Sequence, residues 1–261
     1  MIRSSVNTRA FSLVELSIVL VILGLLTGGI LAGQSLIRAS ELRSHTTDIQ
    51  RTQAALNTFR DKYFALPGDF RDATKFWTSL GGTGSDATCQ DLAATGQATC
   101  NGNGDGRIDT STTVTYDERF RIWQHLANAG LIEGAYTGKT AGASGTFTTA
   151  AGSNVPAWKA NTIADITYTG AGATSFRMDA AQAGTILCFR AAATGVQPLT
   201  PSENWNIDVK MDDGKPGTGL IIGAKNTWSA LGCSTTDVSA TAEYSLTNPA
   251  KICRFDFNIM N

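Results

Sequence analysis

The stretch that decides the fold is residues 11–37, which read FSLVELSIVLVILGLLTGGILAGQSLI. Between Arg9 and Arg38 the only charged side chain is Glu15. An α-helix needs roughly 20 apolar residues to cross a bilayer, so this stretch is long enough to span a membrane. An acidic side chain inside hydrocarbon costs about 2.5–3.5 kcal/mol, and the stretch contains no Lys or Arg to pair with it. Glu15 therefore needs a partner from outside the stretch.

One cation can come from the chain itself. If the chain is cut after Ala10, Phe11 becomes the N-terminus, and a free α-amine with a pKa near 8 is largely protonated at pH 7. Residues 10–16, Ala-Phe-Ser-Leu-Val-Glu-Leu, resemble the cleavage and methylation motif of type IV pilins and type II secretion pseudopilins. The resemblance implies that a membrane peptidase removes residues 1–10, that Phe11 is N-methylated and that Glu15 assists subunit docking.

The motif departs from the family at one position, because Ala10 stands where the family normally has Gly. Alanine is the next smallest side chain, so we expect cleavage at a lower rate. Two other interpretations of the segment are a cleaved signal peptide and a plain signal anchor. The apolar region of a signal peptide is only 7–15 residues long and precedes its cleavage site. A plain anchor explains the hydrophobicity but gives Glu15 no role.

The sequence predicts four segments: a leader at 1–10, a transmembrane helix segment at 11–37, an amphipathic helix continuation at 38–63 and an α+β domain at 64–261. In the continuation an apolar residue recurs every seven positions, at Leu42, Ile49, Leu56 and Tyr63, which indicates one narrow buried stripe. Ala65-Leu-Pro-Gly68 is expected to end the helix. The resemblance implies a pilin-like arrangement, in which the long helix packs on a mainly antiparallel sheet.

Composition narrows the class of the remaining domain. Charged residues make up 16% of the chain and its net charge is −1, so no basic surface for nucleic acid is predicted. Abundant Thr and Gly favour strands and loops. Hydrophobic patterning predicts a short helix capped by Asp69, a helix at 117–129, and strands at 163–168, 175–178, 185–191, 219–224 and 251–259. In the last strand, alternation predicts a buried face at 253, 255, 257 and 259 and an exposed face between them.

Residues 101–109, Asn-Gly-Asn-Gly-Asp-Gly-Arg-Ile-Asp, resemble the calcium loop of an EF-hand. Oxygen-bearing side chains alternate along the loop, so that several hard ligands can reach one centre. The twelfth position is Thr112 rather than Glu, so Asp117 or Glu118 would have to complete the shell. The alternative is a metal-free turn, because Gly, Asn and Asp favour turns. The expected calcium ligands are Asn101, Asn103, Asp105, the carbonyl of Arg107, Asp109 and Glu118.

A second acidic segment contains Asp208, Asp212 and Asp213. These side chains offer oxygen ligands for a cation, but Asp-Asp-Gly-Lys-Pro at 212–216 is also typical of a turn before a strand. The plain turn is the preferred interpretation of this segment.

Five cysteines in a domain that is expected to lie outside the cytoplasm predict disulfides. Cys89 and Cys100 flank a short segment next to the predicted calcium loop, and Cys233 with Cys253 is the expected second pair. Cys188 is then the odd cysteine, a buried free thiol, although a Cys188–Cys253 pair stays open at this stage.

The expected function is structural rather than enzymatic. The two histidines, His45 and His125, have no Ser, Cys or carboxylate at a spacing typical of catalysis. The resemblance implies a minor pilin or pseudopilin of a type IV pilus-like or type II secretion filament. It implies as partners other pilin-like subunits, a prepilin peptidase and methylase, and an inner-membrane assembly platform. It also implies a single-pass inner-membrane protein with a periplasmic domain, which reaches the cell surface in a filament. A pilus-associated adhesin and a membrane-anchored periplasmic enzyme are the alternatives.

Overall fold

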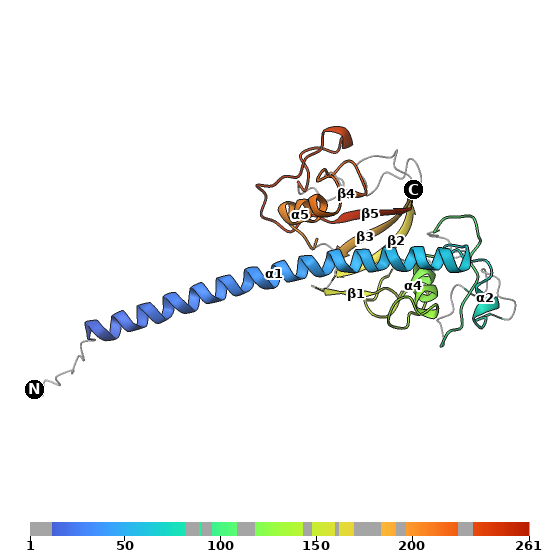
Figure 1. Cartoon of the computed structure of the whole chain (residues 1–261), viewed down its shortest axis with the longest axis horizontal. Helices are drawn as coiled ribbons and strands as arrows, with labels where there is room; N and C mark the ends of the chain where they lie inside the picture. Colours follow the sequence, from blue (N-terminus) through green and yellow to red (C-terminus); the bar gives the residue numbers. More distant parts are fainter. Residues whose placement is uncertain are drawn as a thin grey trace, which may run out of the picture. The chain divides into compact units, whose positions relative to one another are not determined.

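A computed structural model describes residues 12–81, 89, 96–108, 118–142, 148–159, 162–169, 184–191, 197–223 and 232–260. The chain divides into two compact units, Met1–Arg43 and Ser44–Asn261. The described residues form a long N-terminal helix and a small antiparallel sheet with short helices, which is an α+β fold (Figure 1).

The helix α1 runs without interruption from Leu13 to Tyr63. Its N-terminal part contains a segment that is long and apolar enough to cross a membrane by length and composition, and none of this segment is buried. In the second unit α1 buries one stripe, which consists of His45, Ile49, Thr52, Ala55, Leu56 and Phe59. The three- and four-residue spacing of this stripe is that of one helix face. Of the predicted apolar stripe, Ile49 and Leu56 are buried, whereas Leu42 and Tyr63 are only partly buried.

The sheet has the strand order β1-β2-β3-β5-β4, and all neighbouring strands are antiparallel. The strands are β1 (Ala157–Trp158), β2 (Thr162–Thr169), β3 (Gly184–Ala191), β4 (Ile221–Gly223) and β5 (Phe255–Met260). Four of the five predicted strands match β2, β3, β4 and β5. The predicted strand at 175–178 lies outside the described residues, and the two-residue strand β1 was not predicted.

The described side chains on both faces of β2, β3 and β5 are buried, which corrects the expectation of an exposed face on the last strand. Phe189 faces α1, where its ring centroid lies 4.5 Å from that of His45. On the opposite face Asp165, Cys188 and Asp256 lie in register across β2, β3 and β5, and all three are buried. Alternation of polar and apolar residues predicts two different faces, but it does not predict that the polar face is solvated.

Among the described residues, the short helices are α2 (Ala73–Phe76), α4 (Glu118–Asn128) and α5 (Pro201–Met211), together with the 3-10 helix η2 (Ser239–Thr241). The helix α4 matches its prediction and contacts β2, whereas α5 contacts β4 and was not predicted. The residue that precedes α2 is Asp72, and its side chain makes no cap hydrogen bond. Asp69 is therefore not a helix cap, and its carboxylate is used elsewhere.

The described cysteines form the two expected disulfides, Cys89–Cys100 and Cys233–Cys253. Cys188 is free and buried in β3. The first bridge lies next to the segment that holds the predicted calcium loop. The second joins the chain before η2 to the segment that leads into β5.

Candidate functional site

The N-terminal end of α1 holds the one predicted assembly residue that the structure describes. The backbone N–H of Ser12 donates to a carboxylate oxygen of Glu15 at 2.9 Å, and the N–H of Val14 donates to the Ser12 hydroxyl at 3.3 Å. Together these bonds form a capping arrangement at the helix end. Glu15 thus has a local role that the sequence pattern Ser-x-x-Glu could have indicated. Ala10 and Phe11 lie outside the described residues.

The helix surface beyond Glu15 is apolar and uncovered within its own unit. The side chains of Leu13, Leu25 and Leu36 are each more than 70% exposed. Exposed apolar area of this extent on a soluble protein marks an interaction surface or a membrane segment. This surface therefore requires lipid or other protein to cover it.

The predicted calcium loop folds around the carboxylate of Asp69. One oxygen of Asp69 accepts the N–H of Gly104 and, at 3.1 Å, the N–H of Asp105. The other oxygen accepts the N–H of Gly106 at 2.8 Å. Burial raises the pKa of Asp69, and the three hydrogen bonds act in the opposite direction. Asp69 was not predicted as a member of this site, because the pattern of one segment does not indicate a partner 35 residues away.

The backbone of residues 68–69 packs closely against Gly102 of the loop and against Glu118. A Cβ atom on Gly102 would lie 2.4 Å from Cα of Asp69, and one on Gly68 would lie 2.7 Å from the carbonyl oxygen of Glu118. Gly68 also has φ +92°, which other residues rarely adopt. No side chain fits at Gly102, so this junction requires glycine there.

The side chains of four predicted calcium ligands accept backbone hydrogen bonds. An oxygen of Asn103 accepts the N–H of Asp105, an oxygen of Asp105 accepts the N–H of Arg107, and an oxygen of Glu118 accepts the N–H of Asn103, all at 2.9–3.0 Å. Asn101 accepts the N–H of Thr74 from α2. The loop therefore has hydrogen-bond partners within itself and in α2 and α4. Asp109 lies outside the described residues, so the calcium set at 101–118 stays a prediction.

His125 in α4 forms hydrogen bonds to both segments next to this loop, at Gly68 and at Thr99–Cys100. Its Nδ1 accepts the N–H of Gly68 at 2.9 Å, and its Nε2 lies 2.9 Å from the Thr99 hydroxyl and 3.2 Å from the carbonyl oxygen of Cys100. The imidazole is therefore neutral with its proton on Nε2. Burial, followed by the nearby Arg121 guanidinium, lowers the pKa of His125 to about 3.

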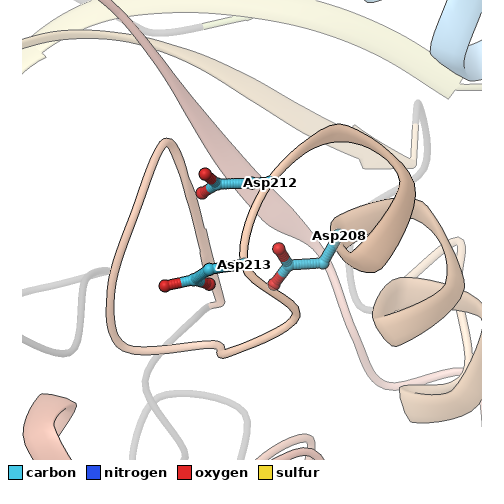
Figure 2. Close-up of side chains that lie close together, drawn as sticks. All are labelled: Asp208, Asp212 and Asp213. Atoms are coloured by element: carbon cyan, nitrogen blue, oxygen red, sulfur yellow. The ribbon is translucent and has the colours of Figure 1, made fainter.

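The acidic residues of the second segment gather at the C-terminal end of α5. Figure 2 shows the carboxylates of Asp208, Asp212 and Asp213, which come from the helix end and the loop after it. Within the described part of the chain these residues form the one group of three or more acidic, His or Cys side chains whose ligand atoms all lie within 4.8 Å of one another. This cluster, which we name the acidic triad, was predicted as a plain turn.

Hydrogen bonds position each member of the acidic triad. Asp208 accepts from the Tyr244 hydroxyl at 2.7 Å and from the N–H of Gly214 at 3.0 Å. Asp212 accepts from the backbone N–H groups of Leu220 and Ile221.

Asp213 accepts from the N–H of Lys215 at 2.9 Å and from the Thr218 hydroxyl. Burial, together with the charges of Asp213 and Asp212, raises the pKa of Asp208 to about 7, although its two hydrogen bonds act in the opposite direction. Three hard oxygen ligands in one small volume can hold a divalent cation, but they do not identify calcium.

The nucleophilic and basic side chains singled out in the sequence are buried. His45 and His125 are fully buried, and burial, followed by the Asp256 carboxylate, raises the pKa of the Cys188 thiol well above its usual range. A buried thiol of this kind is inert towards solvent reagents. The absence of an enzymatic activity nevertheless stays a prediction.

A comparison of the chain with models of protein families, with curated proteins and with solved structures finds no match.

Proposed function

We propose that the chain is a structural subunit, a minor pilin or pseudopilin, of a type IV pilus-like or type II secretion filament. In this proposal the precursor is cut after Ala10, Phe11 is methylated, and the mature subunit assembles through α1. Its partners are other pilin-like subunits, a prepilin peptidase and methylase, and an inner-membrane assembly platform. The subunit resides in the inner membrane with its second unit in the periplasm until assembly carries it outwards.

One observation carries the proposal: the uncovered apolar surface of α1 has a single charged residue, Glu15, in its first turn. A plain membrane anchor requires only the apolar surface, and it gives no reason for a carboxylate that costs free energy in lipid. A subunit interface supplies a reason, because the α-amine of Phe11 in the same or a neighbouring chain neutralises the carboxylate. Calcium in the second unit is an additional proposal, supported by the acidic triad and by the loop motif.

Mass spectrometry of the mature N-terminus tests the proposal. In wild-type cells we expect the chain to begin at N-methylated Phe11. Ala10→Gly serves as the matched control that restores the usual family residue, and it should increase the fraction of cleaved chain. Ala10→Leu should leave the leader attached, because the cleavage site accepts only a small side chain. A wild-type chain that retains Met1 in cells with an active peptidase would contradict the proposal.

A further inference from the structure

A cleft of about 1230 Å³ opens in the second unit at the C-terminal end of α1. One wall is a stripe of α1, and the other is formed by the Asp69–Asp72 segment, the glycines of the 101–108 loop and the start of β3. The stripe consists of Asn57, Arg60, Asp61 and Phe64, which recur at the spacing of one helix face. Within the described part of the chain, no hydrogen bond or ion pair engages the side chains of Asn57, Arg60 and Asp61.

Phe64 lies at the end of the stripe, in a backbone conformation that phenylalanine rarely adopts. Its φ is +54°, and it is the one described non-glycine residue with positive φ. It directly follows α1, and its N–H donates to the carbonyl of Arg60 at 2.8 Å. Glycine or asparagine normally occupies such a position at a helix end. Phe64 is also 93% exposed, so its ring gains no packing that would offset the strain.

Asp61 is the second residue of the cleft that destabilises the C-terminal end of α1. It lies in the last turn of α1, where the helix dipole favours cations and disfavours a carboxylate. Its neighbours Arg60 and Lys62 have the favoured charge. Two residues that face one cleft are thus unfavourable for the helix end that carries them. Unfavourable residues of this kind concentrate at binding sites, where the strain is retained for function.

The opposite wall is already ordered. The Arg71 guanidinium donates to the carbonyl oxygen of Asn103 at 2.8 and 3.1 Å, and Asp72 forms a 2.9 Å ion pair with Lys75. These contacts hold the side chains of Arg71 and Asp72 in place. The α1 stripe provides an amide, a guanidinium and a carboxylate next to one aromatic ring, and a ligand could bond to these groups.

The chemistry of the cleft narrows the class of its ligand. Positive and negative residues are mixed in its lining, as Arg60 and Arg71 against Asp61, Asp69 and Asp72, which favours neither a phosphate nor a polybasic ligand. The strand that reaches the cleft, β3, pairs with β2 and β5 on its two sides, so it offers no free edge to an extended peptide. A neutral, polyhydroxylated ligand uses donors, acceptors and an aromatic face together.

We propose that this cleft binds a neutral oligosaccharide, with the Phe64 ring against one sugar face and Asn57, Arg60 and Asp61 bonded to its hydroxyls. The site goes beyond the role of a filament subunit and does not depend on assembly. Binding is measured on the separate chain, so a failure of this proposal and a failure of filament assembly are distinguishable.

The test uses the full chain in a zwitterionic detergent, because a detergent with a sugar head group would compete for the cleft. The probe is a printed array of neutral and acidic oligosaccharides, and titration calorimetry follows with the neutral oligosaccharide that binds best. We expect selective binding of neutral oligosaccharides by the wild type. Phe64→Asn should weaken this binding at least about tenfold and raise the Tm by about 2–4 °C, as expected for the release of roughly 1 kcal/mol in a domain of this size.

Asp61→Asn should likewise weaken binding without lowering the Tm. Leu246→Asn is the matched control, since Leu246 is half-exposed and does not line the cleft, and it should bind as the wild type does. Three results would overturn the proposal: no binding of any neutral oligosaccharide, a preference for acidic ones, or an unchanged affinity in Phe64→Asn. A lower Tm of Phe64→Asn would also overturn it, because the strain argument would then be wrong.

Discussion

At the scale of single residues, Glu15 combines a local role with the proposed role in assembly. Its carboxylate accepts the N–H of Ser12, and this bond requires only an oxygen acceptor. Neutralisation of a neighbouring α-amine requires a negative charge. Glutamine supplies the acceptor without the charge, so substitution can separate the two roles.

We predict that Glu15→Gln and Glu15→Ala both insert into the membrane and both fail to assemble. Loss of the charge leaves an amine without its partner, a defect that costs about 3–5 kcal/mol when the pair is buried. Ser12→Ala is the control, because it removes the hydroxyl that accepts the N–H of Val14 and retains the charge. It should assemble nearly as the wild type does. The measurement is the amount of subunit in sheared filaments, and assembly of Glu15→Gln alone would favour the capping role.

Asp208 is the residue whose protonation should be visible in stability. Burial raises its pKa to about 7, whereas an unfolded chain has a value near 4. Between these values the folded state holds a proton that the unfolded state releases, so the free energy of unfolding falls as pH rises from 4 to 7. The fall is at most about 1.4 kcal/mol per pH unit, and it ends above the folded pKa.

We predict that Asp208→Asn removes this fall, because the amide oxygen still accepts from Tyr244 but does not titrate. Denaturant unfolding between pH 4.5 and 7.5, with a metal chelator present, measures the difference between the two chains. The variant should gain stability over the wild type as pH rises. His125 titrates in both chains and therefore cancels in the difference. Parallel curves for the two chains would contradict the raised pKa.

At the scale of elements, the acidic triad and the 101–109 loop are two competing locations for a cation. The triad brings together three carboxylates at the end of α5. In the loop, the N–H groups of Gly104, Asp105 and Gly106 point to the Asp69 carboxylate. The geometry of the described residues favours the triad, and the sequence motif favours the loop.

We predict that calcium raises the Tm of the chain and that Asp213→Asn abolishes the increase. A ligand at 100 times its Kd adds about 2.7 kcal/mol, which corresponds to roughly 5–10 °C for a domain of this size. Asp105→Asn is the matched variant in the loop, and it should retain the increase. The opposite pattern would place the ion in the loop. An unchanged Tm in the wild type would exclude a stabilising calcium site.

The elements that could be predicted are those whose signal lies within one segment. The stripe of α1, the apolar face of α4 and the strands β2 and β3 all follow from local periodicity. The helix α5 was missed although it has a local signal, a capping box between Thr200 and Glu203 with Pro201 at the first turn. Its acidic C-terminal end was interpreted as a turn instead.

At the scale of the whole molecule, contacts between distant segments could not be predicted. The pattern of residues 101–109 predicts a tight loop. It does not indicate that backbone N–H groups of this loop donate to the Asp69 carboxylate. The cleft beside α1 likewise combines residues from four separate segments. Burial of the polar face of the sheet, with Asp165 and Asp256 on it, depends on which segments cover it, and the strand pattern has no information on that.

The contact between Gly102 and the Asp69 turn has a consequence for how relatives of this chain can be found. Since no side chain fits at Gly102, we expect relatives of this chain to retain glycine there. The same argument applies to Gly68 and to the acceptor at Asp69. Pro-Gly-Asp followed at a variable distance by Asn-Gly-Asn-Gly is therefore a fingerprint that should persist in homologues too divergent for ordinary alignment. Genomes can be searched with this pair of short signatures in chains that have a long apolar helix before them.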